Sequence, residues 1–287
     1  MITAAAISDF AAKYPVAVCA ELTAVRGSSP RAAGTFMLIA ADDLLGTIGG
    51  GALEHLVIER ARKVMREGLP AGTLDVPLGP EIGQCCGGRV EVALMLTEAR
   101  KIAELQRRAA AEAAAWPDVF VFGAGHVGRA LARALALLPV RTHVVDTRQD
   151  ELAGLPGTVE LVMTALPEAV VRSAPRGSAY VILTHDHALD FLIAEEALKR
   201  TDAPYVGMVG SRTKRARFKT WYLAEGGAEP ALERLVLPIG AMGLGDKRPE
   251  VIAALAAAEI MVHIGRREVQ DLSARPATER RGAAVGR

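Results

Sequence analysis

Hydrophobic and polar residues alternate with two different periods along this chain, and the change of period divides it into two parts. Residues 15–25 and 89–97 have the alternating or continuous apolar pattern that is typical of strands. Residues 52–68 instead repeat apolar side chains at helical spacing. We therefore predict a small α+β domain over residues 1–97.

Beyond residue 118, short apolar runs such as VFVFG and AYVIL alternate with amphipathic segments such as RALARALALL. Strands and helices that alternate with short links predict a parallel sheet covered on both faces. We assign residues 118–267 to a Rossmann-like, doubly wound parallel-sheet domain, so the predicted fold class is α/β. The alanine-rich residues 98–117 are predicted to be a helical connector, and the polar, arginine-rich residues 268–287 a disordered tail.

The segment VFVFGAGHVG combines an apolar strand, a glycine turn and the start of a helix. Gly123, Gly125 and Gly128 fit the G-x-G-x-x-G pattern, whose glycines allow a tight turn, close approach of the backbone to phosphate, and close packing of helix on strand. Asp146 follows the last glycine by 18 residues, the usual position of a carboxylate that accepts a hydrogen bond from a ribose hydroxyl. These residues predict a site for a phosphate-bearing ligand without defining a reaction.

Further contacts are expected at the other strand ends, because ligands in open parallel sheets bind outside the carboxyl ends of the strands. His126 lies in the first turn after the glycines, His185 ends the run AYVILTHD, and Ser211 and Arg212 follow the run PYVGMVG. Each of these positions also permits a plainer role, as a helix cap or part of a solvated cationic face. Asp190 is expected to be an N-cap or first-turn acid of the next helix.

Three consecutive glycines, Gly49, Gly50 and Gly51, precede the helix predicted for residues 52–68. Glycine leaves the backbone free to adopt positive φ and to lie against a ligand, and a helix N-terminus offers its N–H groups to an anion. This loop is a second candidate phosphate cradle. A turn that merely requires small residues explains it equally well.

Two adjacent cysteines, Cys85 and Cys86, lie between Gln84 and a pair of glycines. Neighbouring side chains in extended backbone point in opposite directions, and the Cys/His spacing of zinc sites is missing, so a structural zinc site is not expected. The two cysteines are either small buried hydrophobic residues or an accessible, reactive thiol in a tight loop.

The charges nearly balance, with 34 Lys and Arg against 33 Asp and Glu, so we expect neither nucleic acid nor an anionic membrane as a partner. Three cysteines are too few for a disulfide framework, and no apolar run reaches the roughly 18 residues of a membrane span, so a cytoplasmic protein is expected. The sequence has no P-loop lysine motif, no H-E-x-x-H motif and no Ser-His-Asp order. Two classes remain: a nucleotide-dependent oxidoreductase, and a protein that binds or carries a phosphate-bearing cofactor.

Several motifs occur in one order across both predicted domains, among them RGSSPRAAGTFMLI, GTIGGGALEH, GQCCGGRVEV, FGAGHVGRALA, YVILTHDHALD and YVGMVGSRTKRARF. In this order they resemble the XdhC/CoxI family of xanthine dehydrogenase accessory factors. The resemblance implies a chaperone, not an enzyme, that binds the molybdenum cofactor (molybdopterin), protects it during sulfuration and inserts it into xanthine dehydrogenase. It also implies a cysteine desulfurase as a partner and self-association as a dimer. The alternative is an NAD(P)-dependent oxidoreductase that uses the GAGHVG turn, so a nucleotide remains a candidate ligand of the Rossmann-like domain.

The positions that match the family's motifs, and that the resemblance implies as cofactor contacts, are Gly49, Gly50, Gly51 and Glu54, the loop from Gln84 to Gly88, and Gly123, Gly125, His126 and Gly128. The resemblance favours Cys86 as the contact to molybdenum, because many relatives keep a single cysteine before Gly-Gly and thiolates prefer soft ions. Many members of the carbon monoxide dehydrogenase branch carry cysteine where this chain has Gly51. This departure points to the xanthine dehydrogenase branch.

Overall fold

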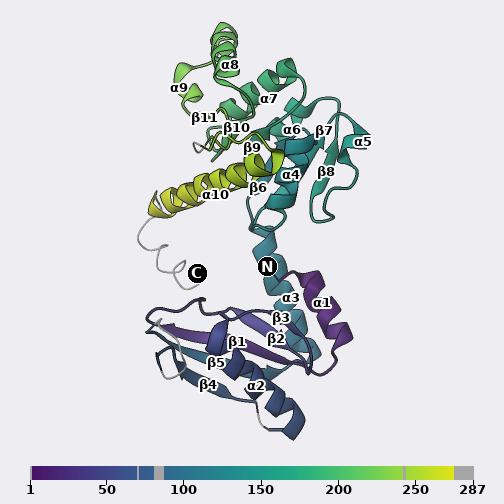
Figure 1. The fold of residues 1–287 in the computed structure, drawn as a ribbon, viewed down its shortest axis with the longest axis vertical. Coiled ribbons are helices and arrows are strands. Elements are labelled where there is room, and N and C mark those ends of the chain that lie inside the picture. Colours follow the sequence, from purple (N-terminus) through teal and green to yellow (C-terminus); the bar gives the residue numbers. More distant parts are fainter. Residues whose placement is uncertain (1, 70, 81–86, 242–243, 275–287) are drawn as a thin grey trace. The chain divides into compact units, whose positions relative to one another are not determined.

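The computed structural model describes residues 2–69, 71–80, 87–241 and 244–274. The chain forms two compact units, of which the first ends at Ala114 and the second runs from Ala115 to Ala274 (Figure 1). Within the described ranges, none of the helices combines the length and the apolar composition that crossing a bilayer requires.

The first unit is an antiparallel sheet with helices on both faces (Figure 1). Its strands, in the sheet order β3-β2-β1-β5-β4, are β1 (Val18–Arg26), β2 (Phe36–Ile39), β3 (Leu44–Gly46), β4 (Thr73–Pro77) and β5 (Arg89–Leu96). Helix α2 (Gly51–Glu67) packs on one face, and α1 (Ala4–Lys13) and α3 (Ala99–Ala114) pack on the other.

The first part of the central strand β1, residues 18–22, contributes to an apolar cluster on each face, because successive side chains point to opposite faces of a sheet. Val18, Ala20 and Leu22 belong to the apolar cluster under α2, whereas Cys19 belongs to the cluster under α1 and α3. This explains why the strand begins with consecutive apolar residues, VCA.

Helix α3 is fastened to the first unit by both apolar and charged contacts. Leu105 is fully buried in the cluster that α1 also covers. Lys101 Nζ lies 3.0 Å from Glu21 Oε2, and Arg108 Nη1 lies 2.7 Å from Glu21 Oε1. The segment predicted as a connector therefore supplies a covering helix of the first unit.

The second unit contains a parallel six-stranded sheet in the order β11-β10-β9-β6-β7-β8. Its strands are β6 (Asp118–Phe122), β7 (Arg141–Asp146), β8 (Glu160–Met163), β9 (Ala179–Ile182), β10 (Val206–Met208) and β11 (Leu235–Val236). Strand β6 pairs with β7 on one side and β9 on the other, so the strand order reverses direction between β6 and β9. The predicted α/β class and the Rossmann-like, doubly wound sheet are confirmed.

Helices cover both faces of this sheet (Figure 1). Helices α4 (His126–Leu135) and α10 (Pro249–Ala274) pack against each other on one face, and α6 (Pro167–Ser173), α7 (His187–Lys199) and α8 (Arg212–Ala224) cover the other. The short helices α5 (Gln149–Leu152) and α9 (Glu229–Leu232) lie in connections between strands. Helix α10 continues past Arg267, the predicted end of the domain.

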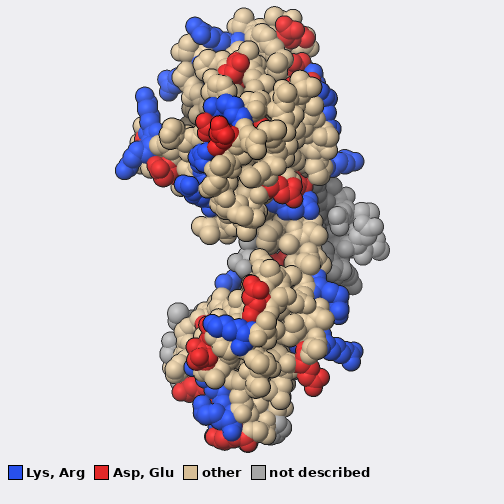
Figure 2. Space-filling model, turned by 90° about the vertical axis from the view of Figure 1, so that its right-hand side faces the viewer, with Lys and Arg blue, Asp and Glu red and all other residues tan. Residues whose placement is uncertain are grey.

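The surface charges follow the balanced composition. On the face that Figure 2 shows, basic and acidic side chains are interspersed over each unit.

Candidate functional site

The three glycines of the turn after β6 have different structural roles. Gly123 has a φ of +105°, and a Cβ at this position would lie 2.5 Å from the carbonyl oxygen of Leu183 at the end of β9. A Cβ on Gly128 would lie 1.9 Å from the carbonyl oxygen of Gly123. These two glycines therefore allow the turn, the helix and the neighbouring strand to pack closely.

Gly125 differs because it faces open space. It is the N-cap of α4, its φ is −68°, and nothing lies within 4 Å of the place where its Cβ would be. The N–H groups of the first turn of α4 have no acceptor within the helix, and an anion is the natural partner for them. His126, the first residue of the helix, is exposed at the same place. The backbone at Gly125 is thus open to a ligand phosphate.

Asp146, at the end of β7, is hydrogen-bonded to this turn. Its carboxylate is 5% exposed and accepts hydrogen bonds from the backbone N–H of Ala124 at 2.8 Å and of Arg148 at 3.0 Å. The guanidinium of Arg148 donates two more, from Nε at 3.1 Å and Nη2 at 3.3 Å. Burial opposes ionisation, but the hydrogen bonds from Arg148 and Ala124 outweigh it, so the pKa of Asp146 lies below its usual range. Asp146 therefore fixes the glycine turn to β7, and its role toward a ligand stays a prediction.

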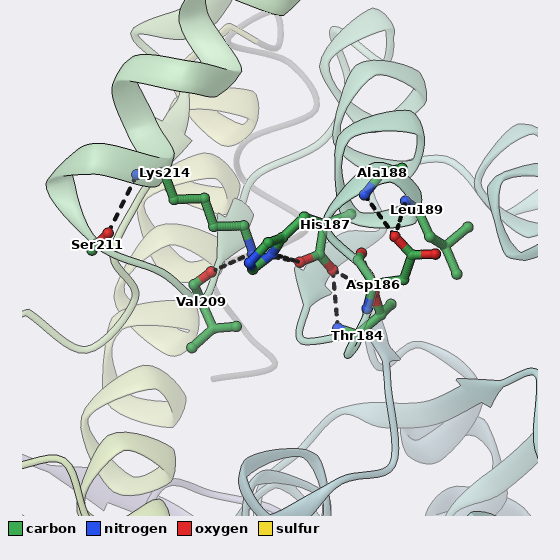
Figure 3. Close-up of polar contacts among 9 residues, drawn as sticks. Thr184, Asp186, His187, Ala188, Leu189, Val209, Ser211 and Lys214 are labelled. Carbon is green, nitrogen blue, oxygen red and sulfur yellow. Dashed lines mark hydrogen bonds and ion pairs between the residues drawn. The ribbon is translucent and has the colours of Figure 1, made fainter.

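The ends of β9 and β10 carry a second group of polar side chains (Figure 3). Asp186 is the N-cap of α7, because its Oδ1 accepts from the N–H groups of Ala188 at 2.8 Å and Leu189 at 3.4 Å. Asp190, expected as an N-cap or a first-turn acid, lies in the first turn and is fully buried. Its Oδ1 accepts from the N–H of Thr184 at 3.0 Å and from the Thr184 hydroxyl at 2.7 Å.

Lys214 completes this group from helix α8. Figure 3 shows its side chain reaching toward Val209 and the start of α7. Its Nζ donates to Asp190 Oδ2 and, at 2.9 Å, to the carbonyl oxygen of Val209, and the residue is only 9% exposed. Ser211, the N-cap of α8, accepts from the N–H of Lys214 at 3.3 Å. The buried pair of Lys214 and Asp190 joins the ends of two neighbouring strands.

The sequence did not predict this pair of Lys214 and Asp190. The feature of the sequence that could have indicated the pair is the position of the two residues. Each lies in the first turn of a helix that follows a strand. The predicted residues His185, Ser211 and Arg212 are exposed at these strand ends and remain candidate contacts.

A chain of contacts connects the glycine turn with the buried pair. Gly123 packs against Leu183 and Thr184, Thr184 donates to Asp190, and Asp190 accepts from Lys214. The ends of β6, β9 and β10 are therefore held together at the point where the strand order reverses. Ligands of doubly wound sheets bind at such a point.

In the first unit, three of the sequence motifs come together. A Cβ on Gly49 would lie 2.6 Å from Pro30 Cγ, and a Cβ on Gly88 would lie 2.0 Å from the carbonyl oxygen of Ser28. The loop that contains Ser28 and Pro30 thus contacts both the triple glycine and the glycine pair after the cysteines. Gln84, Cys85 and Cys86 lie outside the described residues, so their roles stay predictions.

Glu54 accepts several hydrogen bonds from the loop that contains the three glycines. Its Oε2 accepts from the hydroxyl of Thr47 at 2.5 Å, from the N–H of Ile48 at 3.2 Å and from the N–H of Gly50 at 3.1 Å. A carboxylate is favourable at a helix N-terminus for the same reason as a phosphate. The loop therefore supplies its own anion at the position where a ligand phosphate was one of the two alternatives considered.

Cys19 is a buried thiol of β1, and burial raises its pKa to about 12. It is a structural residue rather than a nucleophile. Among the described residues, no three His, Cys, Asp or Glu side chains are placed to hold a metal ion. The predicted molybdenum contact, Cys86, lies outside that part of the chain.

Comparison with known protein families shows to which family the chain belongs. Residues 119–260 match the XdhC Rossmann domain, and residues 11–77 match the XdhC and CoxI family. The chain belongs to the XdhC and CoxI family. The resemblance found in the sequence is therefore confirmed, and both units of this XdhC and CoxI family member carry matched residues.

Two similar proteins give further context for this XdhC and CoxI family member. An uncharacterised protein of Escherichia coli strain K12, YqeB, is 29% identical over 252 residues, which cover 84% of this chain and 42% of YqeB. The chain thus spans less than half the length of that relative. A crystal structure from Bacillus halodurans, described as a xanthine dehydrogenase, superposes with a TM-score of 0.74 at 20% identity, over 93% of this chain and 97% of that chain. This second similarity shows a shared fold.

Proposed function

We propose that this protein is an accessory chaperone that binds the molybdenum cofactor, holds it during sulfuration and inserts it into xanthine dehydrogenase. The observation that carries the proposal is the family match in both units, at residues 11–77 and 119–260. A cysteine desulfurase and a second copy of this chain are the further partners we propose. In this role the protein binds and transfers a cofactor and is not itself an enzyme.

The glycine turn of the second unit is the place we propose for the cofactor phosphate. Gly125 leaves room for close approach, and the first turn of α4 offers N–H donors. At the triple glycine, Glu54 already accepts from Ile48 and Gly50, and its negative charge would repel a phosphate. This contrast favours the turn at Gly125 over the one at Gly49–Gly51.

In the first unit, the thiol loop is the part that we propose as a separate contact for the molybdenum of the cofactor. Gly88, which follows the two cysteines in the sequence, packs against Ser28, in the loop that also contacts Gly49. When bound, the cofactor would supply the molybdenum–sulfur centre that the target enzyme needs. A thiolate of Cys86 is a suitable soft ligand for it.

Binding of isolated molybdenum cofactor to the purified protein tests the proposal. We expect saturable binding that weakens in Cys86→Ala, with Cys85→Ala as the neighbouring control. Unchanged affinity in both variants, with unchanged delivery to apo-xanthine dehydrogenase, would refute the thiol assignment. Tight binding of NAD(P)H without any binding of the cofactor would favour the oxidoreductase alternative instead.

A further inference from the structure

Asp146 occupies the position that decides whether a glycine turn of this kind accepts a dinucleotide. In dinucleotide sites, a carboxylate at the end of the strand after the first helix accepts hydrogen bonds from the adenosine ribose. Asp146 ends β7, the strand that follows α4 and pairs with β6. The availability of its oxygen atoms therefore controls ribose binding.

The four acceptor sites of this carboxylate are already filled. A carboxylate offers about four lone-pair sites. Oδ1 of Asp146 accepts from the backbone N–H and from Nε of Arg148, and Oδ2 accepts from the N–H of Ala124 and from Nη2 of Arg148. With 5% of Asp146 exposed, a ribose hydroxyl could reach these oxygens only by displacing Arg148.

Arg148 is held in this position from its other side as well. Its Nη1 lies 3.2 Å from Glu151 Oε1, and Glu151 Oε2 in turn lies 3.6 Å from Arg129 Nη2. Two carboxylates therefore compensate the charge of Arg148. The guanidinium acts as a cover over Asp146 rather than as a free cation for the 2′-phosphate of a phosphorylated dinucleotide.

We propose that Arg148 closes the ribose position of the second unit, so that the glycine turn accepts a phosphomonoester without an attached nucleoside and discriminates against nicotinamide dinucleotides. A ligand that places only its phosphate at Gly125 does not need the oxygens of Asp146. A dinucleotide must either break charge-assisted hydrogen bonds or leave its ribose hydroxyls without their acceptor. The identity of the phosphomonoester as the molybdenum cofactor rests on the proposed function.

Titration of the purified protein with NADH, followed by fluorescence, tests whether Arg148 covers Asp146. Removing a cation should weaken the binding of an anionic dinucleotide if charge alone matters, whereas uncovering Asp146 should strengthen it. We expect Arg148→Ala to bind NADH at least about tenfold more tightly than the wild type. Arg129→Ala, which removes a neighbouring cation that does not contact Asp146, should show no such gain.

The inference is overturned if wild type and Arg148→Ala bind NADH equally well, or if the variant binds it more weakly. Should Arg148→Ala fail to fold in a thermal unfolding assay, Arg148→Gln removes the same paired contact while keeping most of the side-chain length, and the same comparison applies.

A parallel titration with isolated molybdenum cofactor separates this inference from the proposed function. If Arg148→Ala gains NADH affinity but the wild type does not bind the cofactor, the proposed function fails and the role of Arg148 stands. If the wild type binds the cofactor but the variant gains no NADH affinity, the role of Arg148 fails and the proposed function stands.

Discussion

Lys214 donates a hydrogen bond to Asp190, a carboxylate with no exposed surface, across the ends of β9 and β10. The same carboxylate holds Thr184, whose backbone packs against Gly123 of the glycine turn. One ion pair thus supports the strand ends around the proposed phosphate position.

Removing only one member of this pair should be strongly destabilising. Lys214→Met leaves Asp190 buried without its counter-charge, so we expect the free energy of unfolding to fall by about 3–5 kcal/mol. Adding Asp190→Asn removes both charges and should recover part of that loss. Urea denaturation of the single and double variants measures both effects.

The control for this prediction is Lys219→Met, on the same helix. Lys219 is exposed and pairs with exposed Glu229, so its loss should change stability little. Equal destabilisation by the two lysine substitutions would contradict the special role of Lys214.

Two glycine substitutions in the turn after β6 should affect stability and ligand binding to different degrees. In Gly128→Ala the new methyl group would meet the carbonyl of Gly123, and we expect a loss of about 1–3 kcal/mol in the free energy of unfolding. In Gly125→Ala the methyl group meets no protein atom, so stability should stay within about 1 kcal/mol of the wild type. Thermal or urea unfolding measures the difference.

Gly125→Ala should nevertheless weaken cofactor binding, because its methyl group occupies the space through which a phosphate would approach. Gly157→Ala is the matched control, since a Cβ there also meets no protein atom and the residue lies in another loop of the same unit. Equal cofactor affinity of both alanine variants would argue against a phosphate at Gly125.

Asp202 gives a prediction for the dependence of stability on pH. Its carboxylate accepts from Nε and Nη2 of Arg200, both at 3.0 Å, and from the N–H of Gly177 at 2.9 Å. The hydrogen bonds from Arg200 hold the pKa of Asp202 far below its usual value. Because the folded-state pKa is depressed, this stabilisation is complete above the unfolded-state pKa of about 3.9 and is lost as pH falls toward the folded-state pKa.

Asp202→Asn should therefore lower the free energy of unfolding at pH 7 by about 2 kcal/mol, the scale of hydrogen bonds to a charged group. The difference from the wild type should shrink steadily below about pH 4. Unfolding curves over this pH range provide the check, and a difference that does not change with pH would contradict the assignment.

Cys19 should be chemically silent in the folded protein. In a Cys85→Ala, Cys86→Ala variant it is the last of the three cysteines, and its pKa of about 12 with full burial predicts no alkylation at pH 8. Alkylation should appear after denaturation, as mass spectrometry can show. Rapid reaction of the native variant would show that the face of β1 under α1 and α3 is open.

Much of the fold could be predicted because it depends on local patterns. The apolar run of β1 and the turn at Gly123–Gly128 are recognisable from neighbours in the sequence alone. The parallel sheet followed from the regular change between strands and helices.

The contacts of the site could not be predicted in the same way, because they depend on which strands become neighbours. Lys214 and Asp190 are separated in the sequence, and they meet only because β9 pairs with β10. The glycines at 49–51 fitted a phosphate cradle and a plain turn equally well, and only the geometry shows that Glu54 binds the donors of that loop. Likewise, the sequence gives no sign that Arg148 covers Asp146.

Reconstitution of apo-xanthine dehydrogenase tests the central claim most directly. The measurement is the activity recovered when the apo-enzyme receives sulfurated molybdenum cofactor that was first bound to this protein, compared with the same amount of free cofactor. The proposed function predicts more active enzyme from the bound cofactor, with a reduced yield when Gly125→Ala replaces the wild type. Equal yields from free cofactor and from cofactor mixed with the wild-type protein would contradict it.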